Sequence, residues 1–291
     1  MKNILIYFDM DNRPSPFDIL FAYDVGFDIV LPFSGVKGDE ITALVQDAMF
    51  PRGPKGVKYT TLFFGGSDLD AVEKMAKNAK KTLFPPFQLS IILDPKGAHT
   101  TSSALVAKVQ EALNKKGETF KNKKAAVLGG GGRLGRVISR ILAKEGLEVT
   151  VVDVIEGVEK VAEKIQGEVG GMVKGVRATS PEEIVSVAKG CEILISTGPA
   201  GIEIIPREFL PKLENCIVAS DVNAVSPTGI GGIKPTDDKE EVEGILGIGA
   251  LAIGNLRNKV AAKMMEDAMV AKKGFFNYTH AYEYAKELSD I

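Results

Sequence analysis

The residue pattern best suited to chemistry is a glycine turn, Gly130-Gly131-Gly132-Arg133-Leu134-Gly135, which fits G-x-G-x-x-G. An apolar run precedes it at residues 125 to 128, and apolar residues at helical spacing follow it. A strand, a glycine turn and a helix in this order predict a dinucleotide site. The pyrophosphate is expected on the helix N-terminus, where unpaired N–H groups and the helix dipole attract an anion.

Three glycines of the turn have separate expected roles. Gly130 allows the tight turn, Gly132 lets the pyrophosphate approach the backbone, and Gly135 lets the helix pack against the strand. A glycine turn with a purely structural role in some other βαβ unit is the alternative to a dinucleotide site.

A carboxylate, Asp153, ends the next predicted strand, which covers residues 148 to 152. At this position it can accept hydrogen bonds from the ribose hydroxyls of NAD, and it would repel the 2′-phosphate of NADP. The nearest cation downstream is Lys160, and the place of Arg133 inside the turn suits the pyrophosphate better. We therefore expect NAD as the cofactor, with NADP possible.

Polar loops also follow the strands predicted over residues 192–196 and 217–220. Ligands of doubly wound sheets bind beyond the carboxyl ends of the strands. The loops should therefore face the same crevice as the glycine turn. The further cofactor contacts expected there are Thr197, Gly198, Asp221 and Asn223.

Strands alternate with helices along the chain, which predicts an α/β protein with parallel sheets. Residues 1–118 form an N-terminal α/β domain, and the polar, basic segment 115–124 crosses into a Rossmann-type doubly wound domain over residues 119–250. Residues 251–291 are expected to be helical and to pack back on the first domain, completing it.

The 291 residues are 45% hydrophobic with a formal net charge of −2, which argues against non-specific nucleic-acid binding. The N-terminus does not look like a signal peptide, and the apolar stretch 245–253 is too short to span a membrane. Cys191 and Cys216 fall in predicted strands and are expected to be buried, reduced thiols. These features predict a cytoplasmic protein.

Other chemistries find little support in the residues. The two histidines, His99 and His280, have no metal-ligand spacing, so no metal site is expected. Asp9-Met10-Asp11 after an apolar strand is similar to the nucleophile motif of haloacid-dehalogenase phosphatases, but Asn12-Arg13 replaces the Gly-Thr that should follow. The segment 94–101 ends a strand and opens a helix, so a turn with an N-cap is the alternative to a ligand loop.

These motifs in this order resemble the NAD(P)-dependent methylenetetrahydromethanopterin dehydrogenases of methylotrophs and their relatives, over nearly the whole chain. Besides the glycine turn, the resemblance is carried by Phe8-Asp9, Pro14-Ser15-Pro16-Phe17-Asp18, Tyr23-Asp24, Phe64-Gly65-Gly66, Leu93-Asp94 with Gly97 and Thr100-Thr101, Asp221-x-Asn223-Ala224, Pro227-x-Gly229-Ile230-Gly231-Gly232-Ile233 and Gly244-x-Leu246-Gly247-Ile248-Gly249. NADP-specific members carry a basic segment where this chain has Asp153-Val154, which points to the NAD-using branch.

The resemblance implies oxidation of the methylene group that bridges two nitrogens of tetrahydromethanopterin, with hydride passing to the nicotinamide. Such an enzyme would be a homo-oligomer that serves formaldehyde oxidation or one-carbon interconversion. It needs no general base or metal, because positioning and electrostatics dominate. The residues expected to position the substrate are Asp94, Thr100, Thr101 and Asn223 at the pterin or its linker, Asp9 and Asp18 at the pterin nitrogens, and Lys96 and Lys259 at the acidic tail.

Two alternatives remain at this stage. The carrier could be tetrahydrofolate, or the cofactor NADP, with the same reaction. A protein of a different class, a sensor that binds NAD without turning over a pterin, would also carry the glycine turn.

Overall fold

The computed structural model describes residues 1–289 and 291. By its internal contacts the chain divides into two compact units, Met1–Thr100 with Asn258–Tyr284, and Thr101–Arg257 with Ala285–Ile291. The first division falls inside helix α5 (Ala98–Lys115), earlier than the crossing at residues 115–124 expected from the sequence. The reason is that α5 beyond Thr100 bonds to the second unit: Ser102 Oγ, for example, donates to Leu134 O at 3.2 Å.

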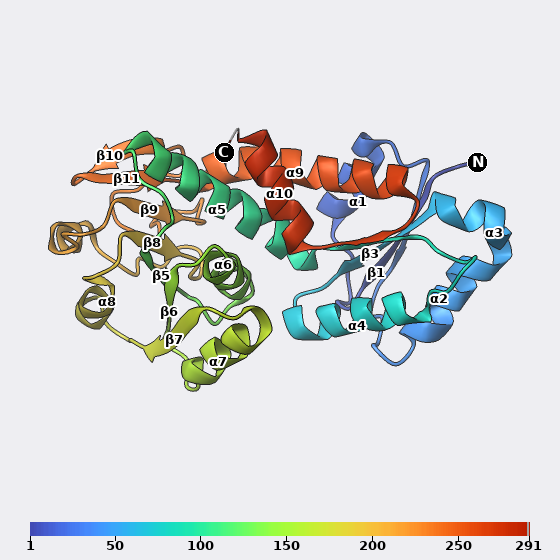
Figure 1. The fold of residues 1–291 in the computed structure, drawn as a ribbon, viewed down its shortest axis with the longest axis horizontal. Helices are drawn as coiled ribbons and strands as arrows, with labels where there is room; N and C mark the ends of the chain where they lie inside the picture. Colours follow the sequence, from blue (N-terminus) through green and yellow to red (C-terminus); the bar gives the residue numbers. More distant parts are fainter. Residues whose placement is uncertain (290) are drawn as a thin grey trace. The chain divides into compact units, whose positions relative to one another are not determined.

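The first unit contains a five-stranded sheet in which every neighbouring pair is parallel (Figure 1). Its strand order is β12-β4-β3-β1-β2, and the strands are β1 (Ile4–Asp9), β2 (Ile29–Phe33), β3 (Thr60–Gly65), β4 (Ser90–Leu93) and β12 (Gly274–Phe276). Because β3 and β4 are buried at every position, they form the centre of this unit.

Helices α1 (Pro16–Val25) and α4 (Leu69–Thr82) of the first unit begin at side-chain caps. Ser15 accepts a hydrogen bond from Asp18 N and precedes Pro16, and Asp68 accepts one from Ala71 N. The helices are α1 (Pro16–Val25), α2 (Ile41–Met49), α3 (Gly53–Gly56), α4 (Leu69–Thr82), the start of α5, and most of α9 (Ala250–Ala271) and α10 (Tyr278–Leu288), with short 3-10 turns at Phe50–Arg52, Val57–Tyr59 and Pro95–Gly97.

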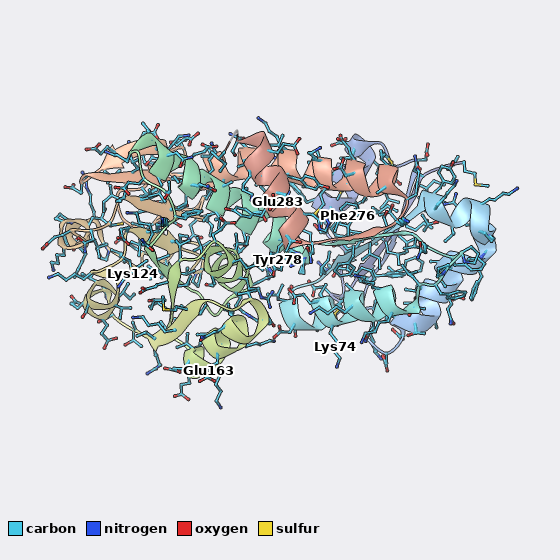
Figure 2. The ribbon with its side chains drawn as sticks, in the orientation of Figure 1. Lys74, Lys124, Glu163, Phe276, Tyr278 and Glu283 are labelled. Carbon is cyan, nitrogen blue, oxygen red and sulfur yellow. The ribbon has the colours of Figure 1, made fainter. Side chains whose placement is uncertain are left out.

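Asn258–Tyr284 belongs to the first unit, whereas the flanking segments, which were also expected there, group with the second unit. β12 pairs in parallel with β4, and α10 begins directly after it. Phe276 and Tyr278, labelled in Figure 2, mark this return, and the Tyr278 ring lies 5.5 Å from the ring of His99. Strand β12 was not expected from the sequence, because three residues at the end of a helical region carry too little pattern.

The second unit contains a seven-stranded sheet in the order β10-β11-β9-β8-β5-β6-β7. Its strands are β5 (Lys124–Leu128), β6 (Glu148–Asp153), β7 (Met172–Arg177), β8 (Ile193–Ser196), β9 (Val218–Asp221), β10 (Asp238–Val242) and β11 (Ile245–Ile248), and its own helices are α6 (Arg133–Lys144), α7 (Val158–Val169), α8 (Pro181–Ala188) and a 3-10 helix at Arg207–Lys212. From β5 the chain builds outward to β7 and then returns to β8 on the other side. That reversal is the switch point at which doubly wound sheets bind ligands, so the predicted α/β class with a Rossmann-type sheet is confirmed.

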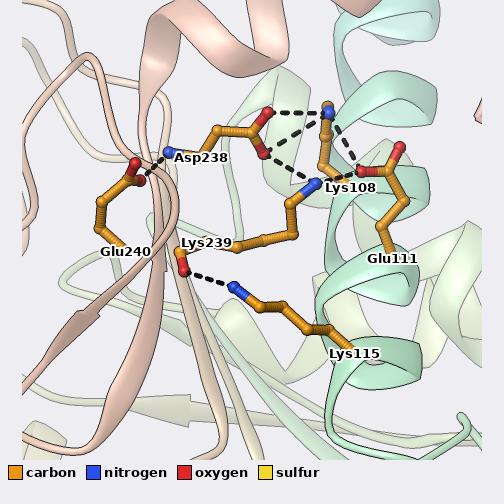
Figure 3. Close-up of polar contacts among 6 residues, drawn as sticks. All are labelled: Lys108, Glu111, Lys115, Asp238, Lys239 and Glu240. Atoms are coloured by element: carbon orange, nitrogen blue, oxygen red, sulfur yellow. Dashed lines mark hydrogen bonds and ion pairs between the residues drawn. The ribbon is translucent and has the colours of Figure 1, made fainter.

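The antiparallel hairpin of β10 and β11 was missed by the sequence pattern, since the polar segment DKEEV has low β propensity. Charges tie it to α5 instead (Figure 3). Lys108 Nζ lies 3.0 Å from Glu111 and 3.2 Å from Asp238, and Lys239 Nζ lies 2.7 Å from Glu111. Charged side chains of this kind also protect an edge strand against pairing with other chains.

Both cysteines are buried free thiols, as expected, and burial raises the pKa of Cys216 to about 12. Among the described residues, no helix has the length and apolarity needed to cross a membrane.

Candidate functional site: a dinucleotide turn and a separate acidic cluster

The glycine turn joins β5 to α6 in the second unit. Gly129 has a positive φ of 66°, Gly130 N donates to Val152 O at 3.0 Å, and Gly132 is the N-cap of α6. Within the described part of the chain no side chain caps this helix. Because helix N-termini hold N–H groups without intrahelical partners, this end of α6 is suited to an anion.

Close packing explains the glycines at 130 and 135. A Cβ atom on Gly135 would lie 2.5 Å from Gly130 Cα, and one on Gly130 would lie 2.6 Å from Val127 O. Any larger residue would therefore push the helix away from the strand or open the turn. The bare backbone and the uncapped helix end together fit the pyrophosphate of a dinucleotide.

Asp153 lies at the carboxyl end of β6, beside this turn. Its Oδ2 accepts a hydrogen bond from Gly131 N at 2.9 Å, and its Oδ1 accepts one from Val154 N at 2.8 Å. A carboxylate has about four acceptor positions, so the backbone fixes its orientation while leaving capacity for ribose hydroxyls. The geometry fits the ribose role expected from the sequence.

Arg177 is a cation opposite Asp153 on the neighbouring strand, and the order of residues in the sequence does not indicate this proximity. Strands β6 and β7 pair in parallel with Arg177 opposite Asp153, and Arg177 Nε donates to Val154 O at 2.9 Å. Sequence order makes Lys160 the nearest base, because nothing local indicates that the end of β7 reaches the end of β6. A register for β7 would have been needed to find Arg177.

Thr197 joins the end of β8 to the glycine turn. Its hydroxyl lies 2.9 Å from Leu128 O and 3.0 Å from Gly129 O, and its backbone N–H donates to Leu128 O. Thr197 and the following Gly198 therefore belong to the same group of loops as the turn, as expected.

Asp221 holds its own loop together. Its side chain accepts hydrogen bonds from Asn223 N at 2.9 Å and from Ile230 N at 2.7 Å. Burial raises the pKa of Asp221, and these backbone N–H groups only partly oppose that shift. Asn223 Nδ2 in turn donates to Pro199 O at 3.3 Å, which links the two loops expected at the cofactor site.

An acidic cluster occupies the carboxyl end of β1 in the first unit. The buried Tyr7 hydroxyl lies 2.6 Å from Asp9 Oδ2 and 3.1 Å from Asp18 Oδ2. Burial, followed by the negative charge of Asp18 and the hydrogen bond to Asp9, raises the pKa of Tyr7 far above its usual value. The phenol therefore stays protonated and acts as a donor between two buried carboxyl groups.

Lys96, in the loop after β4, balances part of the charge of this cluster. Its Nζ lies 3.6 Å from Asp9 and 3.1 Å from Asp11, and Ser67 Oγ donates to Asp11 at 2.7 Å. The backbone of Lys96 is left-handed, with φ 47°, which is uncommon for a residue other than glycine. Such strained positions cluster at functional sites, and this one brings the ammonium to the carboxylates.

Asp94 caps the start of α5. Its Oδ1 accepts hydrogen bonds from His99 N at 2.8 Å and Thr100 N at 3.1 Å, and its Oδ2 accepts one from Thr100 Oγ1 at 2.7 Å. Asp94 therefore supplies cap-like hydrogen bonds to the first turn of α5, although it lies before the N-cap position of that helix. The ring of His99 is buried, with Nδ1 2.7 Å from Leu93 O and Nε2 3.5 Å from Glu73.

Comparison with known proteins identifies the family. Residues 16–96 match the family model described as methylene-tetrahydromethanopterin dehydrogenase, N-terminal. An NAD(P)-dependent methylenetetrahydromethanopterin dehydrogenase of Methylorubrum extorquens strain AM1 is 35% identical over 281 residues, which cover 94% of this chain and 95% of that protein. The chain belongs to the methylenetetrahydromethanopterin dehydrogenase family. The bifunctional protein MdtA of the same organism is 32% identical over 289 residues, covering 99% of each chain.

Solved structures share the fold of this family member at low identity. Shikimate 5-dehydrogenase from Listeria monocytogenes has a TM-score of 0.54 at 16% identity, covering 99% of this chain and 96% of that one. The NAD-dependent malic enzyme of Thermotoga maritima has a TM-score of 0.56 at 13% identity, covering 98% and 84%. These likenesses show a common overall fold.

The structure places the family's expected site residues in separate groups. The second unit gathers the glycine turn, Asp153, Thr197, Asp221 and Asn223 around the carboxyl ends of its strands. The first unit gathers Asp9, Asp18 and Lys96 with Tyr7 and Asp11, which the sequence did not single out as a cluster. Asp94 and Thr100 bond to each other; Thr101 is half-buried on α5 and Lys259 is exposed on α9. No group of three or more His, Cys, Asp or Glu side chains in the described residues could hold a metal ion.

Proposed function

We propose that this protein oxidises methylene-tetrahydromethanopterin to methenyl-tetrahydromethanopterin, with direct transfer of hydride to NAD(P)+. The main support is a close-packed glycine turn suited to a dinucleotide, with a carboxylate at the end of β6. This turn occurs in a chain that aligns over 94% of its length with an NAD(P)-dependent methylenetetrahydromethanopterin dehydrogenase. When bound, the nicotinamide supplies the hydride acceptor.

The acidic cluster of the first unit suits the charge that develops on the pterin. Loss of hydride from a methylene group between two nitrogens leaves an amidinium-like cation, which preorganised carboxylates stabilise. We assign this role to Asp9 and Asp18, because both are buried and are held by the hydroxyl of Tyr7. Lys96 balances part of their charge before substrate arrives and keeps Asp9 in place.

The remaining substrate contacts follow from the same proposal. Thr101 and Asn223 would contact the pterin or its linker, together with Asp94 and Thr100 at the start of α5. Lys259, exposed on α9, would hold the acidic tail. Lys96 was expected to share this last role, but its ammonium already faces two carboxylates, which favours the positioning of Asp9 instead.

Asp153 would make NAD the favoured cofactor. Replacing it by glycine removes the acceptor for the ribose hydroxyls, and a hydrogen bond to a charged group contributes about 1.5–3 kcal/mol. We therefore expect Asp153→Gly to weaken NAD binding roughly tenfold or more, with a smaller effect on NADP. If the preference for NAD survives this change, the ribose assignment is wrong.

The protein is proposed to be a cytoplasmic homo-oligomer with no nucleic-acid or membrane partner. Exposed apolar side chains of α1 and the edge strand β2 support the oligomer: Phe17, Leu20, Tyr23, Leu31 and Phe33. Light scattering after size-exclusion chromatography measures the subunit number, and a monomer at micromolar concentration would contradict this part of the proposal.

An anaerobic assay tests the function. Formaldehyde-charged tetrahydromethanopterin, and tetrahydrofolate in parallel, are incubated with NAD or NADP while the absorbance of reduced nicotinamide is followed. Turnover with the methanopterin carrier supports the proposal, and turnover with the folate carrier alone reassigns the substrate. An NAD-binding sensor is the outcome if NAD binds and neither pterin is turned over.

A further inference from the structure

In the pairing of strands β6 and β7, Arg177 is the residue opposite Asp153. It ends β7, which lies beside β6 in Figure 1, and the parallel register sets the two residues opposite each other. Its Nε donates to Val154 O, in the loop that follows Asp153. The carboxylate and the guanidinium thus flank the same loop at the carboxyl edge of the sheet.

The guanidinium keeps most of its hydrogen-bonding capacity at this position. It has five N–H donors, and the bond to Val154 O uses one of them. Glu183 interacts electrostatically with Arg177. Its carboxylate, however, accepts its hydrogen bonds from Thr179 N at 2.7 Å and Thr179 Oγ1 at 3.1 Å. Arg177 is exposed, as is Val154 beside it, so a ligand can reach the guanidinium from solvent.

The surroundings of Asp153 also reduce its repulsion of an anion. Its carboxylate accepts hydrogen bonds from the backbone N–H groups of Gly131, Val154 and, at 3.4 Å, Ile155. These donors offset part of the negative charge, and the fixed cation of Arg177 acts from the neighbouring strand. A phosphate on the ribose 2′-oxygen would meet one partly neutralised carboxylate and one permanent cation.

We propose that Arg177 binds the 2′-phosphate of NADP, so that the nucleotide site accepts both dinucleotides. Asp153 favours NAD through the free ribose hydroxyls, and Arg177 sets how far NADP is tolerated. The fork of an arginine suits the oxygens of a phosphate and allows two parallel hydrogen bonds. The inference rests on the dinucleotide site of the proposed function, and it assigns a specificity residue to that site.

Isothermal titration of the full-length protein separates this role from catalysis. The probes are 2′,5′-ADP and 5′-ADP, which differ only in the 2′-phosphate, followed by NADP and NAD. The variants are Arg177→Gln, Arg177→Lys and Lys174→Gln. Lys174 is an exposed cation on the same strand, so its replacement controls for the loss of one positive charge.

We expect Arg177→Gln to raise the Kd for 2′,5′-ADP and NADP about tenfold or more, since a charge-assisted hydrogen bond contributes about 1.5–3 kcal/mol. The Kd for 5′-ADP and NAD should stay within about twofold, which lies inside the usual effect of a surface substitution. Arg177→Lys should retain part of the affinity, and Lys174→Gln should leave all four values unchanged.

Three results overturn the inference. Arg177→Gln could weaken both members of each pair equally, which would give Arg177 only the structural role of holding the Val154 loop. It could also leave 2′,5′-ADP binding unchanged, or the wild-type protein could bind NAD and no NADP. In all three cases the dehydrogenase proposal stands, whereas a wild-type protein that binds no dinucleotide removes both.

Discussion

Substitutions of Asp94 distinguish between two roles of its side chain, stabilising the start of α5 and contacting the substrate. Its side chain accepts three hydrogen bonds at the start of α5, two from backbone N–H groups and one from the Thr100 hydroxyl. Asp94 is 2% exposed, so water cannot substitute for the lost acceptor without rearrangement. We therefore expect Asp94→Ala to destabilise the first unit and Asp94→Asn to do so much less.

The magnitude follows from the partners that are lost. Loss of an N-cap costs about 1 kcal/mol, and each buried donor left without an acceptor costs about 1–3 kcal/mol. These terms overlap, because the cap bond is one of the lost bonds, so we expect about 2–4 kcal/mol for Asp94→Ala. In Asp94→Asn the amide oxygen can still accept from both N–H groups, and Thr100 can turn its hydroxyl into an acceptor. That variant should lose about 1 kcal/mol or less.

Urea unfolding followed by far-ultraviolet circular dichroism measures the difference. With a slope of about 2–3 kcal/mol per molar urea, Asp94→Ala should lower the midpoint by about 1 M. Hydrogen exchange at the amides of His99 and Thr100 gives a local reading, because these groups lose their acceptor. Asp68→Ala is the matched control: Asp68 caps α4 in the same unit, but it is exposed and its side chain bonds only to Ala71 N among the contacts described.

The refuting result is an Asp94→Ala variant no less stable than Asp68→Ala. The capping account would then be wrong, and the bonds seen at the start of α5 would contribute little. If Asp94→Asn keeps its stability and its NAD affinity but loses pterin turnover, the carboxylate contacts substrate as well. Full activity of Asp94→Asn would restrict Asp94 to building the helix.

The glycine turn and the α5 charge network give two further predictions. Gly135→Ala should lose about 1–3 kcal/mol of stability and most NAD affinity because its Cβ would lie 2.5 Å from Gly130 Cα; Gly167→Ala, which meets nothing within 4 Å inside α7, is the control, and equal behaviour of the two in thermal unfolding would contradict the packing argument. At Glu111 burial disfavours the charge, but hydrogen bonds led by that from Lys239 outweigh it and lower the pKa. The stability that the charged Glu111 side chain contributes is therefore fully present above pH 4.5, its ordinary pKa, and is lost as the pH falls through the lowered pKa of the folded protein. Glu111→Gln should cost about 0.5–1 kcal/mol near pH 7 and progressively less as the pH falls below 4.5 by urea unfolding, and a difference independent of pH would refute the ionic account.

Local patterns were sufficient for much of the second unit. The glycine turn and the alternation of strands and helices are set by contacts within a few residues. Steric and hydrogen-bonding rules act at that range, so these elements could be predicted. The same alternation predicted the α/β fold class, and the ordered set of motifs, which is more specific than any one of them, predicted the family.

The hairpin of β10 and β11 could not be predicted in the same way. Strand β10 is polar, and it exists because β11 pairs with it and because α5 supplies oppositely charged partners. The partners lie far apart in the sequence, so no local window contains the reason for the strand.

The sequence by itself determined that a dinucleotide turn is present and that Asp153 stands at the end of the following strand. Only the tertiary structure decided what surrounds these residues. The register of β6 against β7 brings Arg177 to Asp153, and the left-handed backbone at Lys96 carries its ammonium to Asp9 and Asp11. Both placements depend on strand pairing and packing over long stretches of chain, because the free energy that fixes them comes from the assembled sheets and not from neighbouring residues.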